Sequence, residues 1–302
     1  MSNQQSFIKI SPRLLVFDSG LGGLTVTRAL REAVPEARIA YVADDAGFPY
    51  GALDEATLRA RVLTVVGDSI RAMRPDAVVI ACNTASTMAL SALRGAHAVP
   101  FIGTVPAIKP AAALSRSRFV SVLATPATVS REYTRALIAE HGQGCAFTLV
   151  GSNKLAAIAE RIMAGDSLPD AAILGEIAPC FVEDGGRRTD VVVLACTHYP
   201  LLIERLERLA PWPVTWLDPA PAIARRTANI LAEAGFVVGV GAQRPRGEFY
   251  FTSGELPPAQ VLALLEGSGF GLGRAAAERG PSPPSLDWPV ENWPSHSWKE
   301  AQ

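Results

Sequence analysis

A seven-residue pattern that occurs twice constrains the fold of this chain more than any other feature. The first copy reads DAVVIAC over residues 76–82, and the second reads DVVVLAC over residues 190–196. Short apolar runs rich in β-branched residues are typical of strands buried on both faces of a parallel sheet. A cysteine, Cys82 or Cys196, stands where each strand is expected to end. The repeat therefore predicts two α/β units, each with one thiol at the carboxyl end of a strand.

Strands and helices are predicted to alternate along most of the chain. The expected strands cover residues 14–17, 37–43, 76–82, 101–105, 119–124, 145–150, 190–196, 214–217 and 248–252. Helices are expected between them, including a mostly helical segment over residues 168–183 that breaks at Pro179. Such alternation is typical of an α/β fold with parallel sheets in doubly wound lobes. Beyond about Gly271 the alternation fails, and the Pro- and Ser-rich stretch with three tryptophans predicts an extended or disordered tail.

The composition is that of a globular protein and does not by itself indicate a function. The 302 residues are 49% hydrophobic and 19% charged, as in an ordinary globular protein. A formal net charge of −1 gives no support for binding to nucleic acid or to an anionic membrane surface. No apolar run approaches membrane-spanning length, and the opening residues lack the plan of a secretory signal. Four cysteines without C-x-x-C spacing predict reduced thiols in the cytoplasm.

Polar side chains gather where the predicted strands end, which is where open α/β sheets bind ligands. These candidate site residues are Asp18, Ser19, Pro49, Tyr50, Gly51, Cys82, Asn83, Thr84, Thr125, Thr128, Cys196, Thr197 and His198. They include hydroxyls, amides, one imidazole and two thiols, but no lysine or arginine. Neutral donors with one carboxylate suit the charged groups of a small amino acid. The glycines over residues 20–23 predict a tight turn and close backbone approach to a small ligand.

Two thiols in one cleft suit three kinds of chemistry. These are a disulfide, a metal site for which His198 is available as one of the two further ligands needed, and proton transfer by two bases at one carbon. A lone cysteine at a strand end is more often a core residue, and it is the matched repeat that favours chemistry. Cys145 and Cys180 have no counterpart in the repeat, so we interpret them as structural. Asp76 and Asp190 begin the repeated strands and are interpreted as turn residues.

Five motifs in fixed order carry a resemblance to a known family. They are FDSGLGGLTV at 17–26, PYG at 49–51, ACNTAS at 81–86, VPAIKPAA at 105–112 and ACTHYPLL at 195–202. With these motifs the chain resembles the glutamate racemases of the cofactor-independent aspartate/glutamate racemase superfamily. The resemblance implies two pseudo-symmetric lobes with the active site in the cleft between them. The implied division is residues 14–105 plus 217–270, then 106–216, with a tail over 271–302.

The resemblance also implies an activity and a set of residue roles. Cys82 and Cys196 would be the acid/base pair on opposite faces of the substrate α-carbon, assisted by Asp18 and His198. The implied substrate contacts are Asp18, Ser19, Pro49, Tyr50, Gly51, Asn83, Thr84, Thr125, Thr128, Thr197 and His198. The expected reaction interconverts L- and D-glutamate for peptidoglycan synthesis, without metal or cofactor. The expected partner is a small-molecule substrate. The oligomeric state is not predicted, and a homodimer is one of the options.

Alternatives and departures from the family pattern accompany these expectations. The same two thiols could racemise aspartate or another acid, or the lobes could bind an amino acid without catalysis. Pyridoxal chemistry is disfavoured because neither Lys109 nor Lys154 lies at a predicted sheet end. Before PYG the chain has Asp45 and Gly47 where the family more often has Thr and Arg. Glu183 is the nearest candidate for an assisting carboxylate, but its alignment is ambiguous and no role is assigned to it.

Overall fold

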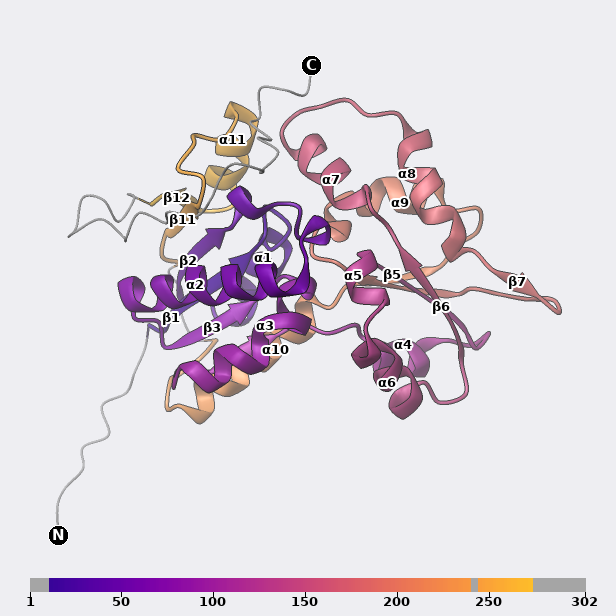
Figure 1. Cartoon of the computed structure of the whole chain (residues 1–302), viewed down its shortest axis with the longest axis horizontal. Helices are drawn as coiled ribbons and strands as arrows, with labels where there is room; N and C mark the ends of the chain where they lie inside the picture. Colours follow the sequence, from indigo (N-terminus) through magenta and orange to yellow (C-terminus); the bar gives the residue numbers. More distant parts are fainter. Residues whose placement is uncertain (1–10, 240–243, 274–302) are drawn as a thin grey trace, which may run out of the picture.

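The computed structural model describes residues 11–239 and 244–273, which form two α/β lobes side by side (Figure 1). Each lobe is built around its own sheet. The sheet of the first lobe has the strand order β12-β11-β2-β1-β3-β4, and that of the second lobe has the order β10-β9-β5-β6. Every neighbouring pair in both sheets is parallel. The predicted fold of two parallel-sheet lobes is confirmed.

The first lobe combines the beginning of the chain with its later part. Its elements are β1 (Arg13–Asp18), α1 (Leu24–Ala33), β2 (Arg38–Ala43), the 3-10 turns η1 (Asp45–Gly47) and η2 (Tyr50–Ala52), α2 (Glu55–Met73), β3 (Ala77–Ile80), α3 (Asn83–Ala96), β4 (Phe101–Gly103), α10 (Ala220–Glu233), β11 (Gly247–Phe251), α11 (Ala259–Gly267) and β12 (Phe270–Leu272). The returning helix α10 packs on α1, which joins the two parts of the lobe.

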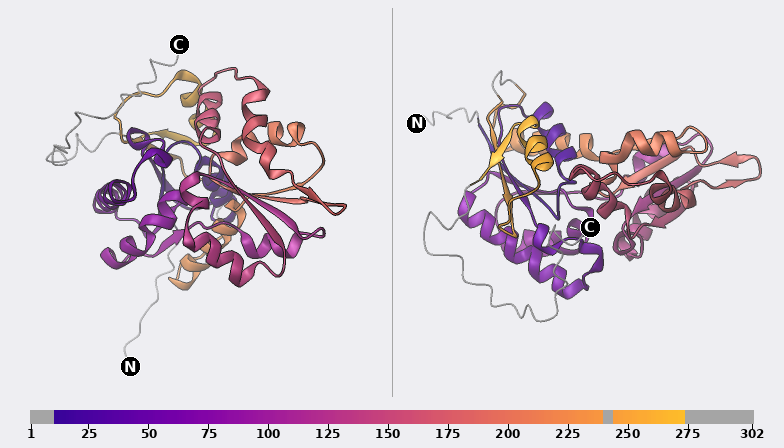
Figure 2. Two further views of the ribbon diagram at one scale, coloured as in Figure 1. Left: turned by 45° about the vertical axis from the view of Figure 1, so that its right-hand side comes forward. Right: turned by 90° about the horizontal axis from the view of Figure 1, so that it is seen from above.

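The second lobe is formed by the intervening residues. Its elements are α4 (Ile108–Leu114), β5 (Phe119–Ala124), α5 (Pro126–Val129), α6 (Glu132–His141), β6 (Ala146–Gly151), α7 (Leu155–Met163), α8 (Asp170–Ile177), η3 (Ala178–Cys180), β7 (Glu183–Asp184), β8 (Arg187–Arg188), β9 (Val191–Ala195), η4 (Tyr199–Leu202), α9 (Ile203–Leu209) and β10 (Thr215–Leu217). Strands β7 and β8 form a hairpin that projects from this lobe (Figure 2).

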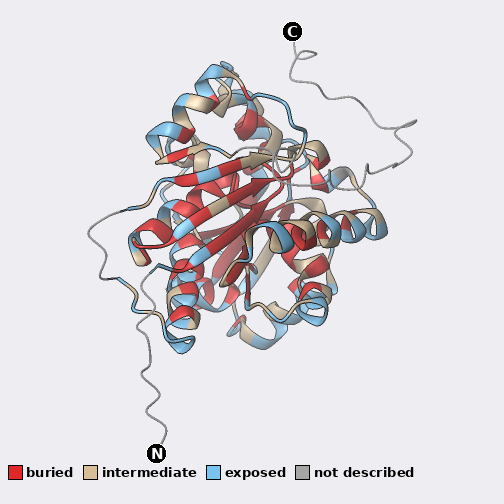
Figure 3. Cartoon of the chain, turned by 90° about the vertical axis from the view of Figure 1, so that its left-hand side faces the viewer, coloured by how far each residue is buried: buried red, intermediate tan, exposed pale blue. Residues whose placement is uncertain are grey.

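Helices cover both faces of each sheet, so the strands are buried between them. In the first lobe, α1, α10 and α11 pack on one face, and α2 and α3 pack on the other. In the second lobe, α7, α8 and α9 share one face, and α4 and α6 share the other. Figure 3 shows buried central strands with exposed residues on the outer surfaces of the helices. The apolar runs of the repeat, in β3 and β9, are fully buried, as their sequence predicts.

Two local predictions differ from the structure. Residues 168–183 were expected to be mostly helical, but helix ends with the short turn at Cys180 and Glu183 begins the β7–β8 hairpin. The tail was expected from residue 271, yet Gly271 and Leu272 belong to β12 at the edge of the first sheet. The remaining predicted tail residues, 274–302, lie outside the described residues. Among the helices that the structure describes, none is long and apolar enough to cross a membrane.

Candidate active site

The carboxyl ends of the central strands of both sheets meet at a shared pocket. In the first lobe, β1 pairs with β3 with Phe17 opposite Ile80, which brings Ser19 and Cys82 to the same edge. In the second lobe, β5 pairs with β9 with Ala124 opposite Ala195, so Thr125 and Cys196 follow side by side. Because parallel strands end at one edge of a sheet, each lobe presents its thiol toward the same space.

The pocket between the lobes encloses about 330 Å³, including the part open to solvent. Its lining consists of Ser19, Phe48, Pro49, Tyr50, Gly51, Cys82, Asn83, Thr84, Thr125, Ala156, Cys196, Thr197 and His198. Most of the residues predicted at the strand ends are therefore brought together. Two predicted residues lie behind the lining: Asp18 is fully buried, and Thr128 is buried with its hydroxyl 3.1 Å from that of Thr125.

The thiol of the first lobe lies in a dry environment. Cys82 precedes the first residue of α3 and is only 5% exposed. Its Sγ lies 3.7 Å from the Ser19 hydroxyl. Burial raises the pKa of the Cys82 thiol, and the negative charge of Asp18 raises it further. In the unliganded protein Cys82 is therefore a protonated thiol at neutral pH.

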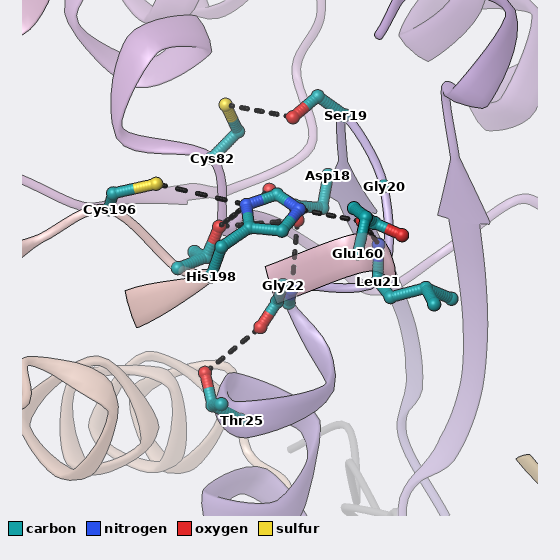
Figure 4. A network of polar contacts seen from close by, with 12 residues as sticks. Asp18, Ser19, Gly20, Leu21, Gly22, Thr25, Cys82, Glu160, Cys196 and His198 are labelled. Carbon is teal, nitrogen blue, oxygen red and sulfur yellow. Dashed lines mark hydrogen bonds and ion pairs between the residues drawn. The ribbon is translucent and has the colours of Figure 1, made fainter. Parts of the chain in front are cut away.

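The thiol of the second lobe has an imidazole as its neighbour (Figure 4). Cys196 Sγ lies 3.8 Å from His198 Nδ1, and His198 Nε2 donates to Glu160 Oε1 at 2.7 Å. Burial alone would lower the pKa of His198, but the contacts with Cys196 and Glu160 outweigh burial and raise it well above its ordinary value. His198 is thus held as an imidazolium. A cation beside a cysteine stabilises the thiolate form.

Asp18 and Glu160 connect the two lobes through hydrogen bonds. Asp18 accepts from the backbone N–H of Gly23 at 2.8 Å and from the Thr197 hydroxyl at 3.2 Å. Glu160 accepts from the backbone N–H of Leu21 at 2.5 Å as well as from His198. Burial raises the pKa of Asp18, and the positive charge of His198 offsets part of that rise.

The glycine-rich turn after β1 also permits a close contact between the two lobes. A Cβ on Gly22 would lie 2.6 Å from both His198 Nδ1 and Thr197 Oγ1. The absence of a side chain therefore lets the first lobe approach the polar side chains of the second lobe. The connection between β1 and α1 is a tight turn, as predicted, and a close backbone approach to a small ligand at residues 20–23 stays a prediction.

Sequence reasoning missed Glu160, which lies on α7 beside buried Leu155, Ile158 and Ala159. A glutamate next to an apolar helix face was the available signal, because an unpaired carboxylate is costly to bury. Glu183, the carboxylate considered from sequence, is exposed in the β7–β8 hairpin. Phe48 was also missed, and its ring lies 5.4 Å from the His198 ring, centroid to centroid.

One buried donor in the pocket has no partner. Asn83 is 2% exposed, and its Nδ2 makes no hydrogen bond in the structure. Buried polar groups nearly always have partners, so an unpaired amide in a pocket suits an acceptor oxygen of a ligand. Within residues 11–239 and 244–273, no group of three or more His, Cys, Asp and Glu side chains is arranged to hold a metal ion.

Known proteins with similar sequences and structures agree on one family. Residues 15–227 match a family model described as Asp/Glu/Hydantoin racemase. The glutamate racemase of Brucella ovis is 58% identical over 219 residues, covering 72% of this chain and 79% of that protein.

Solved structures give the same picture. The crystal structure of Escherichia coli glutamate racemase in complex with L-glutamate and the activator UDP-MurNAc-Ala has a TM-score of 0.78 and 36% identity, covering 86% of this chain and 96% of that chain. The crystal structure of Thermus thermophilus glutamate racemase in complex with β-chloro-D-alanine has a TM-score of 0.66 and 30% identity. The match covers 87% of this chain and 96% of that chain.

Proposed function

The chain belongs to the Asp/Glu/hydantoin racemase family, and from that membership we propose that it interconverts L- and D-glutamate. The observation that carries the proposal is the pair of thiols, Cys82 and Cys196, which line one pocket from equivalent strand ends of two lobes. Racemisation removes a proton from one face of the α-carbon and delivers another to the opposite face. Two acid/base groups from opposite lobes suit such a transfer.

The surroundings of the two thiols assign their first roles. Cys82, buried near Asp18, begins as the thiol that delivers a proton. We assign to Cys196, whose Sγ lies beside the His198 imidazolium, the role of the base that removes the α-proton. After one turnover the states are exchanged, so the opposite enantiomer meets the matching base. Asp18 and His198 assist by setting the charge around each thiol.

Neutral donors of the lining would hold the substrate carboxylates. The unpaired Nδ2 of Asn83 supports such a contact. The other substrate contacts that we propose on the lining are Ser19, Pro49, Tyr50, Gly51, Thr84, Thr125, Thr197 and His198. Asp18 and Thr128 lie behind the lining and would orient the hydroxyls of Thr197 and Thr125 by hydrogen bonds.

We further propose that the D-glutamate product serves peptidoglycan synthesis and that the enzyme works in the cytoplasm. All four cysteines of the chain are free thiols. Proteins of reducing compartments keep their thiols in that form.

Proton exchange tests the proposal directly. The purified protein is incubated with L-glutamate in heavy water without pyridoxal phosphate, and α-deuteration and loss of optical activity are followed together. We expect both to proceed. Cys82→Ala and Cys196→Ala should each lower racemisation by at least about a hundredfold. Cys145→Ala, which removes a thiol outside the pocket, should leave the rate unchanged.

The alternatives give different results in the same experiment. Exchange with aspartate or another acid but not with glutamate would reassign the substrate. Binding of glutamate without exchange would indicate a binding protein. Full racemisation by either pocket variant would refute the two-thiol mechanism.

A further inference from the structure

A fully buried carboxylate behind the pocket collects four hydrogen bonds. Asp44, directly after β2, accepts from Arg61 Nε and Nη2 at 2.6 Å each, from the Tyr50 hydroxyl at 2.5 Å and from the Thr252 hydroxyl at 2.6 Å. The three donors come from α2, from the loop of the pocket and from the end of β11. Bidentate arginine–carboxylate pairs fix geometry as well as charge.

The donor that matters for the pocket is Tyr50. It stands between Pro49 and Gly51 and lines the pocket, while its side chain is buried in the same apolar cluster as Leu58 and Val62 of α2. Burial and the nearby Asp44 carboxylate raise the pKa of Tyr50 well above its ordinary value, so its hydroxyl remains a donor. The position of residues 49–51 is therefore tied to the position of Asp44.

Residues that follow β11 also form hydrogen bonds with the beginning of the same loop, at residues 45 and 46. Ala46 N donates to the Thr252 hydroxyl at 3.3 Å. Asp45 accepts from the backbone N–H and the hydroxyl of Ser253, at 2.9 and 2.5 Å. Asp45, which departs from the usual family pattern, thus has a defined partner in the part of the first lobe that follows the second lobe in sequence.

Gly47, the second departure from the family pattern, makes room for Arg61. A Cβ at residue 47 would lie 2.4 Å from Arg61 Nε and 2.8 Å from Asp44 Oδ2. Where the family more often has an arginine in the loop, this chain leaves space for a guanidinium that comes from α2. The glycine and the arginine therefore form a matched pair.

We propose that Arg61 is a positioning residue, which through Asp44 holds Tyr50 and the Pro49–Gly51 loop in the geometry that binds substrate. The substrate part of the proposal rests on the proposed racemase function. Buried ion pairs add little net stability because desolvation offsets their attraction. Breaking one is different, since without Arg61 the carboxylate of Asp44 would keep only hydroxyl donors and the loop would shift.

The test compares Arg61→Lys with Arg59→Lys, a matched control at an exposed position of the same helix. Lysine keeps the charge but cannot form the bidentate pair. In Arg61→Lys we expect kcat/KM for glutamate to fall roughly ten- to hundredfold, mostly through a higher KM, because small displacements of binding groups have effects of that size. Hydrogen exchange at the backbone amides of residues 45–48, 50 and 51 should become faster. Arg59→Lys should change neither, and circular dichroism verifies that both variants are folded.

A double-mutant cycle adds a second measurement. Gly47→Ala should impair glutamate binding in the native background and impair it less in Arg61→Ala, because there only Asp44 Oδ2 still crowds the added Cβ. Equal effects in both backgrounds would overturn the pairing. A folded Arg61→Lys with native KM and native loop exchange would overturn the positioning role.

The two proposals fail separately. If the native protein does not racemise glutamate but Arg61→Lys speeds exchange of residues 45–51, the racemase proposal is wrong and the positioning of the loop stands. If the native protein racemises glutamate and Arg61→Lys changes neither measurement, the positioning proposal is wrong.

Discussion

At the scale of single residues, the second thiol depends on a buried row of polar groups. Glu160, His198 and Cys196 follow one another at 2.7 and 3.8 Å, and all three are nearly inaccessible to solvent. Burying a charged imidazole is unfavourable unless an opposite charge accompanies it. Glu160 supplies that charge and also accepts from the backbone of the first lobe. Its carboxylate therefore maintains both the charge of His198 and the orientation of the ring.

Glu160→Gln should reveal this role. The amide keeps the size of the side chain but removes its charge, so the pKa of His198 should fall. Racemisation should fall at least roughly tenfold, since hydrogen bonds between charged groups are worth about 1.5–3 kcal/mol and about 1.4 kcal/mol corresponds to a factor of ten. The His198 pKa is measured by NMR titration, with its signal identified from a His198→Gln variant.

Glu204→Gln is the matched control, because Glu204 is an exposed residue of α9. It should leave the titration of His198 and the rate unchanged. An unchanged His198 pKa in Glu160→Gln would show that the carboxylate does not hold the imidazolium.

At the scale of elements, each repeated strand carries an aspartate at one end and a thiol at the other. Asp76 accepts from the backbone N–H of Arg13, where β1 begins. Asp190 accepts from the backbone N–H groups of Arg116 and Ser117, just before β5, and from the Ser115 hydroxyl. In both lobes the aspartate fixes the start of the neighbouring strand. The sequence interpretation made them turn residues, and these hydrogen bonds give each a structural role at the start of a neighbouring strand.

Asp190→Ala should lower the free energy of unfolding by about 1–2 kcal/mol, because three donors lose a charged acceptor. Partial burial would raise the pKa of Asp190, but the hydrogen bonds from Ser115 and residues 116–117 outweigh burial and lower it. A lowered pKa means that the contribution is complete above the unfolded pKa, about 3.9, and is lost as the pH falls through the folded pKa. The difference from the native protein should therefore shrink in acid.

Urea unfolding at pH 7 and at about pH 3 measures both effects. Asp184→Ala, in the exposed strand β7 of the hairpin, is the control and should stay within about 0.5 kcal/mol of the native protein. An equal loss in both variants, or a loss for Asp190→Ala that is independent of pH, would contradict the assignment.

Strands and site residues could be predicted from the sequence where the signal lay in consecutive residues. The apolar runs of β3 and β9, and the thiols that follow them, could be read from seven consecutive residues. Glu160 could not be assigned in this way, because its partners Leu21 and His198 are distant in sequence. The hairpin was missed although Gly185 and Gly186, both with positive φ, form the two-residue turn that such hairpins favour. The helical interpretation of residues 168–183 gave too much weight to the apolar run before Pro179.

At the scale of the whole molecule, the two lobes are joined by hydrogen bonds at the edge of the proposed substrate pocket. Glu160 of the second lobe accepts from Leu21 N of the first, and Thr197 of the second donates to Asp18 of the first. The pocket is lined from both sides. A ligand in this pocket would contact both lobes at once, so its binding and the approach of the lobes are coupled.

Glutamate should therefore protect both lobes. At a concentration of about a hundred times Kd, a ligand that binds only the folded state stabilises it by about 2.7 kcal/mol. We expect a higher unfolding midpoint and slower hydrogen exchange in residues 19–23 of the first lobe and 196–199 of the second. The β7–β8 hairpin, which projects from the second lobe (Figure 2), should exchange at the same rate with and without glutamate. Protection confined to one lobe would show that glutamate binds there alone, and the transfer of protons between the two thiols would then lose its structural basis.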